Sequence, residues 1–192
     1  MQRSSGQTDN PQATESEIAY LAGLWDGEGT ITIRQHDGKT QAILKMANTD
    51  NHIIAAAVGI LDRIGVSPYV VTQLKGDAKK RDQKAVIVTG MDNVNRALVA
   101  MMPHLRGKHG HAYLLLRWIS SRRERGAKKG VKTPTTTEEQ DIINTIRDMN
   151  SRGASTTARA AAAKQKIQSE LHGNMQSMAE TTMPRAGESG GW

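Results

Sequence analysis

Residues 20–31 constrain the fold of this chain more than any other segment. They read YLAGLWDGEGTI, an apolar helical pattern that ends at two carboxylates, Asp26 and Glu28, set among glycines. Acidic side chains are disfavoured at the C-terminus of a helix, because the helix dipole is negative there. We therefore expect a compensating partner for these carboxylates, and a divalent cation is the obvious candidate. The segment occurs once in the chain.

The helix that precedes these carboxylates has two different faces. A capping-box pattern formed by Thr14 and Glu17 predicts that it begins at residue 15, and we expect it to end near residue 26. Its large apolar residues are Ile18, Leu21 and Trp25. A second row holds the small residues Ala19, Ala22, Gly23 and Gly27. Small residues let helix backbones approach closely, so this row predicts either pairing with a second helix or tight packing on the chain's own sheet.

After Gly29 the hydrophobic period changes from helical to strand-like, and the same units then repeat. We expect helices over residues 15–26, 49–64, 91–102, 109–124 and 137–150, and strands over residues 30–36, 41–47, 69–75 and 84–89. Asn48 or Thr49 should cap the second helix, and Gly65 should close it. The order predicts an α+β domain with one antiparallel sheet, which helices cover on one face and which is polar and open on the other.

Composition narrows the class of protein. The chain has 192 residues, with 26 Lys and Arg against 19 Asp and Glu, a formal charge of +7 and no Cys. The charge suggests a polyanionic partner such as nucleic acid, although a merely soluble basic protein remains an alternative. The lack of Cys excludes disulfides and thiolate-bound metals, and no apolar run is long enough for a membrane. We expect an intracellular protein with a disordered tail at 1–13, one domain at 14–153 and a flexible tail at 154–192.

The segment Leu21–Gly29, LAGLWDGEG, resembles the signature of the LAGLIDADG homing endonucleases. The resemblance extends to the order of elements over residues 15–152, to the helix end at 64–66 and to the segment Pro103–Lys108. It implies the α-β-β-α-β-β-α homing-endonuclease fold and a site-specific double-strand DNA endonuclease that uses Mg²⁺ or Mn²⁺. Because the signature occurs once, the resemblance implies the homodimeric type, with a long pseudo-palindromic target.

The resemblance also implies roles for individual residues. Glu28 matches the acidic residue that holds a divalent metal at the scissile phosphate, and Asp26 matches a position that serves the helix interface. Lys108 resembles the active-site lysine. Asn48 is the best match for the polar residue that orders water at the end of the second strand, with Asp50 as an alternative. The basic residue found one turn further in the best-known single-motif members has no clear counterpart here, since the candidates are His52 and the apolar Ile53.

Residues on the open face of the predicted sheet are candidates for DNA contact. They are Thr32, Arg34 and His36 on the first strand, Gln41 and Lys45 on the second, Tyr69, Gln73 and Lys75 on the third, and Lys84 on the fourth. Lys79, Lys80 and Arg81, in the loop between the last two strands, and the basic cluster at 122–132 should meet phosphates. The alternative for each residue is a solvated polar surface.

Two other functions remain open on the same fold. One is an RNA-binding maturase that helps an intron fold, because a basic open sheet can also bind RNA. The other is a catalytically silent DNA-binding regulator, although a pure binder has no need of Glu28. An intein-embedded form is disfavoured, because the chain has no Cys to start splicing.

Overall fold

The computed structural model describes residues 12–73, 82–127, 133–151 and Gln165. The chain divides into two units, Met1–Ser151 and Arg152–Trp192. Only Gln165, which is helical and exposed, is described in the second unit. The tails expected at 1–13 and 154–192 therefore lie largely outside the described residues. None of the described helices is long and apolar enough to span a bilayer.

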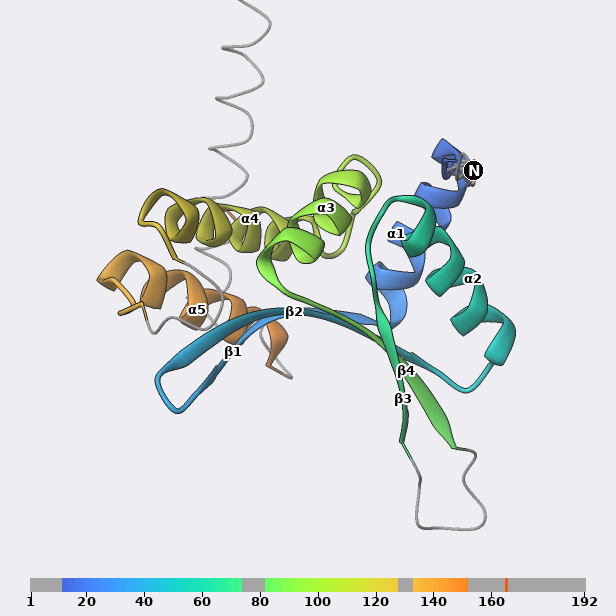
Figure 1. The fold of residues 1–192 in the computed structure, drawn as a ribbon, viewed down its shortest axis with the longest axis horizontal. Helices are drawn as coiled ribbons and strands as arrows, with labels where there is room; N and C mark the ends of the chain where they lie inside the picture. The colour runs from blue at the N-terminus through green and yellow to red at the C-terminus, as the bar shows by residue number, and fades with distance from the viewer. Residues whose placement is uncertain (1–11, 74–81, 128–132, 152–164, 166–192) are drawn as a thin grey trace, which may run out of the picture. The chain divides into compact units, whose positions relative to one another are not determined.

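Helices and strands follow one another in the expected order within the described part of the first unit. They are α1 (Glu15–Glu28), β1 (Gly29–His36), β2 (Lys39–Asn48), α2 (Asn51–Arg63), β3 (Tyr69–Gln73), β4 (Gln83–Thr89), α3 (Met91–Met101), α4 (His109–Glu124) and α5 (Thr137–Asn150). The strands form one antiparallel sheet in the order β1-β2-β4-β3. Figure 1 shows the helices gathered on one side of this sheet, with the other side left open. The predicted α+β class and the open sheet face are confirmed.

The core lies between the sheet and the helices. Alternate residues of each central strand point into it, as the two-residue period requires: Ile31 and Ile33 on β1, Ala42, Leu44 and Met46 on β2, and Val86 and Val88 on β4 are buried. Leu21 and Trp25 of α1 meet them, together with Leu98, Leu115 and Trp118 of the later helices. Burial of a large apolar side chain contributes roughly 1.5–3 kcal/mol, so this layer holds the open sheet in place.

Most predicted boundaries are close to those observed, and two local predictions need correction. Helix α1 continues through Glu28, so both carboxylates lie within its last turn and not beyond its end. Helix α2 is capped by Asp50, whose carboxylate accepts from the His52 amide, and not by Asn48 or Thr49. The predicted capping box of α1 and the role of Gly65 are confirmed, since Gly65 has a positive φ and Val66 N–H closes the helix end on Leu61.

The junction between α1 and β1 contains no loop, because β1 begins at Gly29 directly after Glu28. The Gly29 amide donates to the Trp25 carbonyl, which brings the backbone against the indole of Trp25. A Cβ at Gly29 would lie 2.5 Å from the ring atom Cδ1 of Trp25, a distance that no side chain tolerates. Glycine at this position therefore fixes Glu28 where the helix meets the sheet.

Candidate active site and nucleic-acid interface

The last turn of α1 carries two acidic residues and no basic one. The Glu28 side chain is exposed, and Asp26 is half-buried. Because the dipole of α1 disfavours both charges, each needs a favourable partner. The described part of the chain provides different partners for these two carboxylates.

Asp26 has its partners in the segment between α3 and α4. Its carboxylate accepts a hydrogen bond from the backbone amide of Arg106 at 2.7 Å and one from the backbone amide of Lys108 at 2.8 Å. The Lys108 ammonium also donates to the backbone carbonyl of Asp26. The sequence assigned Asp26 to an interface between two chains, whereas the structure places both of its oxygens on backbone amides of its own chain.

The Lys108 ammonium lies at the last turn of α1, where it donates to the backbone carbonyl of Asp26. Burial lowers the pKa of Lys108 below its ordinary value, and the charges of Asp26 and Glu28 act in the opposite direction. Glu28 is thus close enough to influence a lysine far away in the sequence. The structure brings together two of the residues that the sequence singled out for catalysis.

Asn48 ends β2 close to the same place. Gly29 pairs with Met46 in the β1–β2 register, so residue 48 lies just past the α1–β1 junction. The side-chain carbonyl of Asn48 accepts from the Asp50 amide at 2.9 Å, forming a turn that leads into α2. This contact uses one acceptor position of the Asn48 side chain, whose amide nitrogen is a further donor.

A single chain offers few side chains that could coordinate a metal ion at this site. No group of three or more His, Cys, Asp or Glu side chains that could hold a metal is found among the residues that the structure describes. Since Asp26 is already engaged, Glu28 is the exposed carboxylate at this end of α1. One carboxylate fits Mg²⁺, which commonly keeps several waters and binds substrate phosphates as its remaining ligands.

The predicted row of small residues on α1 divides into exposed and buried members. Gly23 and Gly27 are exposed, and a Cβ built on either would meet nothing within 4 Å. Ala19 is half-buried, and the neighbouring Tyr20, which the sequence did not single out, is 46% exposed. Ala22, which the sequence placed with the small residues of the helix pair, is fully buried in the core of its own chain, so that assignment is corrected. Tight packing of the glycines on the chain's own sheet is excluded.

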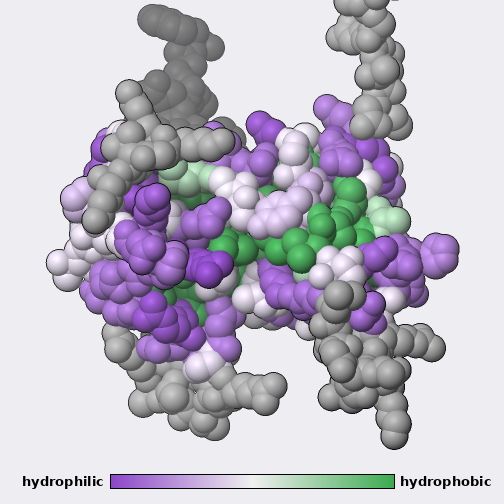
Figure 2. Space-filling view, turned by 60° about the horizontal axis from the view of Figure 1, so that its bottom comes forward, coloured by the Kyte–Doolittle hydropathy of each residue, from purple (hydrophilic) through white to green (hydrophobic). Residues whose placement is uncertain are grey.

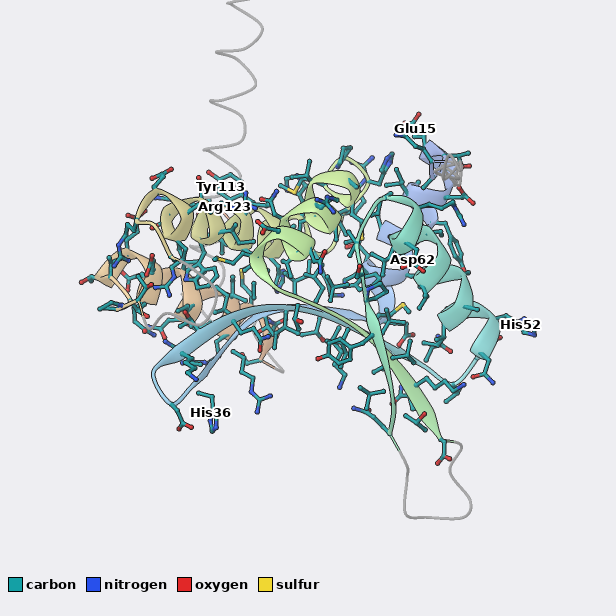
Figure 3. All side chains as sticks on the ribbon, in the orientation of Figure 1. Glu15, His36, His52, Asp62, Tyr113 and Arg123 are labelled. Atoms are coloured by element: carbon teal, nitrogen blue, oxygen red, sulfur yellow. The ribbon has the colours of Figure 1, made fainter. Side chains whose placement is uncertain are left out.

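The open face of the sheet carries most of the predicted DNA-contact residues that the structure describes. Arg34 and Gln41 are exposed and directly opposite each other on β1 and β2. One row crosses all four strands through Thr30, Lys45, Ile87 and Tyr69. Thr32 and Gln73 alternate onto the same face. In Figure 3, His36 projects from the β1 end on the side of the sheet away from the helices.

The chemical character of this open face is mixed. Figure 2 brings it forward and shows hydrophobic residues across the middle, flanked by hydrophilic residues on both sides. The register places Ile43, Ile87 and Val71 on this side of the sheet, and Val71 is 40% exposed. Polar side chains can hydrogen-bond to base edges, and apolar ones can contact a thymine methyl group, so the mixture suits a major groove.

Predictions for the far strands are partly corrected. Lys84 lies two residues before the buried Val86 and is paired with Asn48 and Thr72, which puts it on the helix-covered face and not with the open-face residues. Its neighbour Gln83 takes the open-face position opposite Gln73. Lys75, Lys79, Lys80 and Arg81 lie outside the described residues.

Comparison with known proteins identifies the domain. The family described as "LAGLIDADG-like domain" matches residues 15–98. These residues form a LAGLIDADG-like domain. The matched range contains Glu28, the whole sheet and Asn48, and it ends before Lys108. The resemblance that the signature suggested is therefore confirmed. No curated protein matches the chain.

Solved structures with similar backbones are homing endonucleases and meganucleases in complex with DNA. The homing endonuclease I-CvuI, in complex with the I-CreI target and Mg with the DNA not cleaved, is 17% identical, with a TM-score of 0.45 over 69% of this chain and 96% of that chain. The meganuclease I-AabMI bound to uncleaved DNA is 12% identical, with a TM-score of 0.49 over 68% and 43%. The intron-encoded I-CeuI complexed with DNA is 8% identical, with a TM-score of 0.45 over 62% and 61%.

Outside the matched LAGLIDADG region, the basic cluster predicted to meet phosphates is bound to its own chain. Arg122 has a side chain only 7% exposed, lies 5.4 Å from the Trp118 ring centroid and contacts Glu139 at 3.3 Å. Arg125 also pairs with Glu139, and Arg123 pairs with Asp92. Figure 3 places Arg123 on the helix side of the sheet, away from His36. The prediction is wrong for these arginines, and Lys128, Lys129 and Lys132 lie outside the described residues.

Proposed function

We propose that this protein is a metal-dependent, site-specific DNA endonuclease that acts as a homodimer. The observation that carries the proposal is the hydrogen bond from the Lys108 ammonium to the Asp26 carbonyl, in the last turn of α1 that also carries Glu28, at the edge of an open sheet face in a LAGLIDADG-like domain. A carboxylate and an ammonium at the same helix end are the groups that phosphodiester hydrolysis needs for metal binding and for charge neutralisation. Family membership supplies the reaction class, and the geometry supplies the residues.

Double-stranded DNA is the proposed substrate because the positive charge of the chain and the shape of its open sheet face both suit a DNA major groove. The chain carries a formal charge of +7, which favours a polyanion in general. The open face of an antiparallel sheet can enter a major groove, where every base pair presents a distinguishable pattern. Arg34, Gln41 and Lys45 point from that face and could read bases or contact phosphates. Specificity is therefore expected to depend on β1 and β2.

The residues present fit a divalent metal held by Glu28 together with substrate phosphate and water. Such an ion supplies an activated water and stabilises charge on the phosphate. The exposed side chain of Glu28 leaves room for these oxygen ligands, and its place in the last turn of α1 is fixed by the Gly29 junction. Mg²⁺ or Mn²⁺ suits an oxygen-only donor set.

Lys108 and Asn48 have supporting roles in this proposal. The Lys108 ammonium, held at the end of α1, neutralises negative charge that builds on the phosphate during hydrolysis. Asn48 keeps its amide nitrogen available after its oxygen has bonded to the Asp50 amide. Because Asn48 is in phase with the buried Met46, its side chain would have to turn past the end of β2 to reach a water or a phosphate oxygen near Glu28.

The homodimer is proposed from two exposed glycines of α1, around which the single chain leaves open space. Glycine inside a helix costs about 0.8–1 kcal/mol relative to alanine, and Gly23 and Gly27 occupy such positions without any contact that would require them. A second α1 helix packed at close range explains both glycines. It would also bring two copies of Glu28 together, one for each strand of the duplex. A symmetric dimer favours a pseudo-palindromic target.

Cleavage of a randomised duplex library by the full chain tests this function. The reaction is run with Mg²⁺ and with EDTA, and the double-strand ends are sequenced. We expect ends at a shared long motif with Mg²⁺ and none with EDTA. Binding of one motif without cleavage under any divalent ion would favour the silent regulator. Tight binding of structured intron RNA without DNA cleavage would favour the maturase.

A further inference from the structure

Helix α4 starts without a cap of its own. Its N-cap residue, Lys108, makes no side-chain capping bond, and the first turn contains no acidic residue. The amides at the start of a helix have no partner within the helix, so they need acceptors from elsewhere. By contrast, α1 and α5 each begin with a complete capping box. The start of α4 therefore depends on a more distant group.

Asp26 supplies that group. One of its carboxylate oxygens accepts from Arg106 N–H at 2.7 Å and the other accepts from Lys108 N–H at 2.8 Å. A negative charge at this end of α4 is favoured by the α4 dipole, which offsets the unfavourable position of Asp26 at the end of α1. The compensating partner of Asp26 is thus the N-terminus of another helix.

The contact is reciprocal. The backbone carbonyl of Asp26 is among the last carbonyls of α1, which lack partners within that helix. It accepts from the Lys108 ammonium. The end of α1 and the start of α4 thus satisfy each other's free groups, and the ammonium is held next to the turn that carries Glu28.

We propose that Asp26 is a positioning residue, which fixes the start of α4 and thereby holds the Lys108 ammonium beside Glu28. The inference rests on the proposed nuclease function, because it gives Asp26 a task in that reaction. Both carboxylate oxygens of Asp26 are engaged by backbone amides of the same chain. We expect a graded effect of substitution at Asp26, because both carboxylate oxygens accept hydrogen bonds and an asparagine offers only one acceptor oxygen.

Three full-length variants test this inference. Asp26→Ala removes both acceptors, Asp26→Asn keeps one, and Asp62→Asn on the exposed side of α2 is a matched loss of charge away from the site. Three quantities are measured for each. They are amide hydrogen exchange at Arg106 and Lys108, DNA affinity, and the single-turnover cleavage rate with Mg²⁺.

Asp26→Ala should lose exchange protection at both amides and cleave on the order of 100-fold more slowly, the effect of misplacing a reacting group by about 1 Å. DNA affinity should change less than about threefold. Asp26→Asn should give intermediate cleavage, and Asp62→Asn should match the wild type.

Wild-type cleavage by Asp26→Ala, or lost cleavage with unchanged exchange at both amides, would overturn the inference. So would an equal loss of affinity and cleavage rate. If Asp26→Ala does not fold, Asp26→Asn decides, with partial loss expected in both exchange protection and rate. If the wild type itself cleaves no DNA, the proposed function fails, and the exchange data still decide whether Asp26 holds the start of α4.

Discussion

Lys108 contacts Asp26 twice, through its backbone amide at 2.8 Å and through its side-chain ammonium. The two residues are 82 positions apart in the chain, so the contact joins the end of the first helix to the start of the fourth. Its effect is to place a partly buried cation next to the exposed carboxylate of Glu28. The chemistry proposed for this protein depends on that placement.

Replacing the Lys108 side chain should slow cleavage without weakening binding. Lys108→Met keeps the backbone amide that donates to Asp26 and removes the ammonium. We expect roughly a 100-fold or larger loss in the single-turnover rate, since removal of one charge-stabilising donor typically costs that much. Arg123→Ala, which removes a cation paired with Asp92 on the helix side, is the control. Equal effects of the two variants would contradict the assignment of Lys108.

Charges on the open face should set DNA affinity, whereas equal charges on the helix side should not. Arg34→Ala is expected to weaken binding of the cognate duplex by about 1–3 kcal/mol if Arg34 reads a base, or to lower the salt dependence by about one charge if it meets a phosphate. Fluorescence anisotropy across a salt series separates these cases. Arg117→Ala, whose guanidinium pairs with Glu138, should leave affinity unchanged. Loss of affinity in Arg117→Ala alone would indicate that DNA binds on the helix side of the sheet, which would contradict the proposed interface.

A large side chain at Gly23 should separate the dimer without unfolding the chain. The position is open in the single chain, and leucine is a better helix former than glycine by roughly 0.8 kcal/mol. Gly23→Leu should therefore sediment as a folded monomer, with the secondary structure of the wild type but without the stabilisation that dimerisation provides. Ala56→Leu on the exposed face of α2 is a control for added surface hydrophobicity and should remain dimeric. A dimeric Gly23→Leu would exclude pairing through this face.

Glu139 should make stability depend on pH. Burial raises the pKa of Glu139, but the Thr136 amide, the Arg125 guanidinium and the charge of Arg122 together hold it below its ordinary value. A folded-state pKa below the unfolded one stabilises the fold above the unfolded pKa, and this contribution is lost as pH falls through the folded pKa. Stability should therefore decline with acidification from about pH 4.3 downward.

The matched pair Glu139→Gln and Glu138→Gln tests this prediction by denaturant unfolding at pH 7 and pH 3. Glu139 is fully buried against Arg122, so breaking the pair should cost about 3 kcal/mol at pH 7. The side chain of Glu138 is 61% exposed, and its loss should cost less than about 1 kcal/mol. The deficit of Glu139→Gln should shrink at pH 3. A deficit that is the same at both pH values would show that ionisation of Glu139 is not involved.

The elements that follow from local patterns were predicted well. Helix α4 has the boundaries that its periodicity predicts, and α5 begins where the sequence places it because Thr136 and Glu139 form a capping box. Gly29 ends the motif for a reason that only the structure shows, its contact with Trp25. Local signals therefore suffice for the order of elements and for which residues of β1 and β2 lie on the open face, whereas the apolar middle of that face was not predicted.

Features that depend on distant contacts were not predictable in the same way. The sequence does not indicate that Asp26 meets the amides before α4, because backbone donors leave no residue pattern. The sequence predicts a phosphate contact for Arg122, whereas in the fold its guanidinium is enclosed by Glu139 and Trp118. Lys84 was assigned to the wrong face because a one-residue difference in strand phase reverses the direction of a side chain.

Glu28→Gln tests directly whether Glu28 holds the catalytic metal at a DNA phosphate. The measurement compares wild type and variant for Mg²⁺-dependent cleavage of the recovered target and for affinity to the same duplex. Glutamine keeps the size of the side chain and removes its charge, so binding should persist while double-strand cleavage is abolished. Cleavage by Glu28→Gln at the wild-type rate would contradict the account.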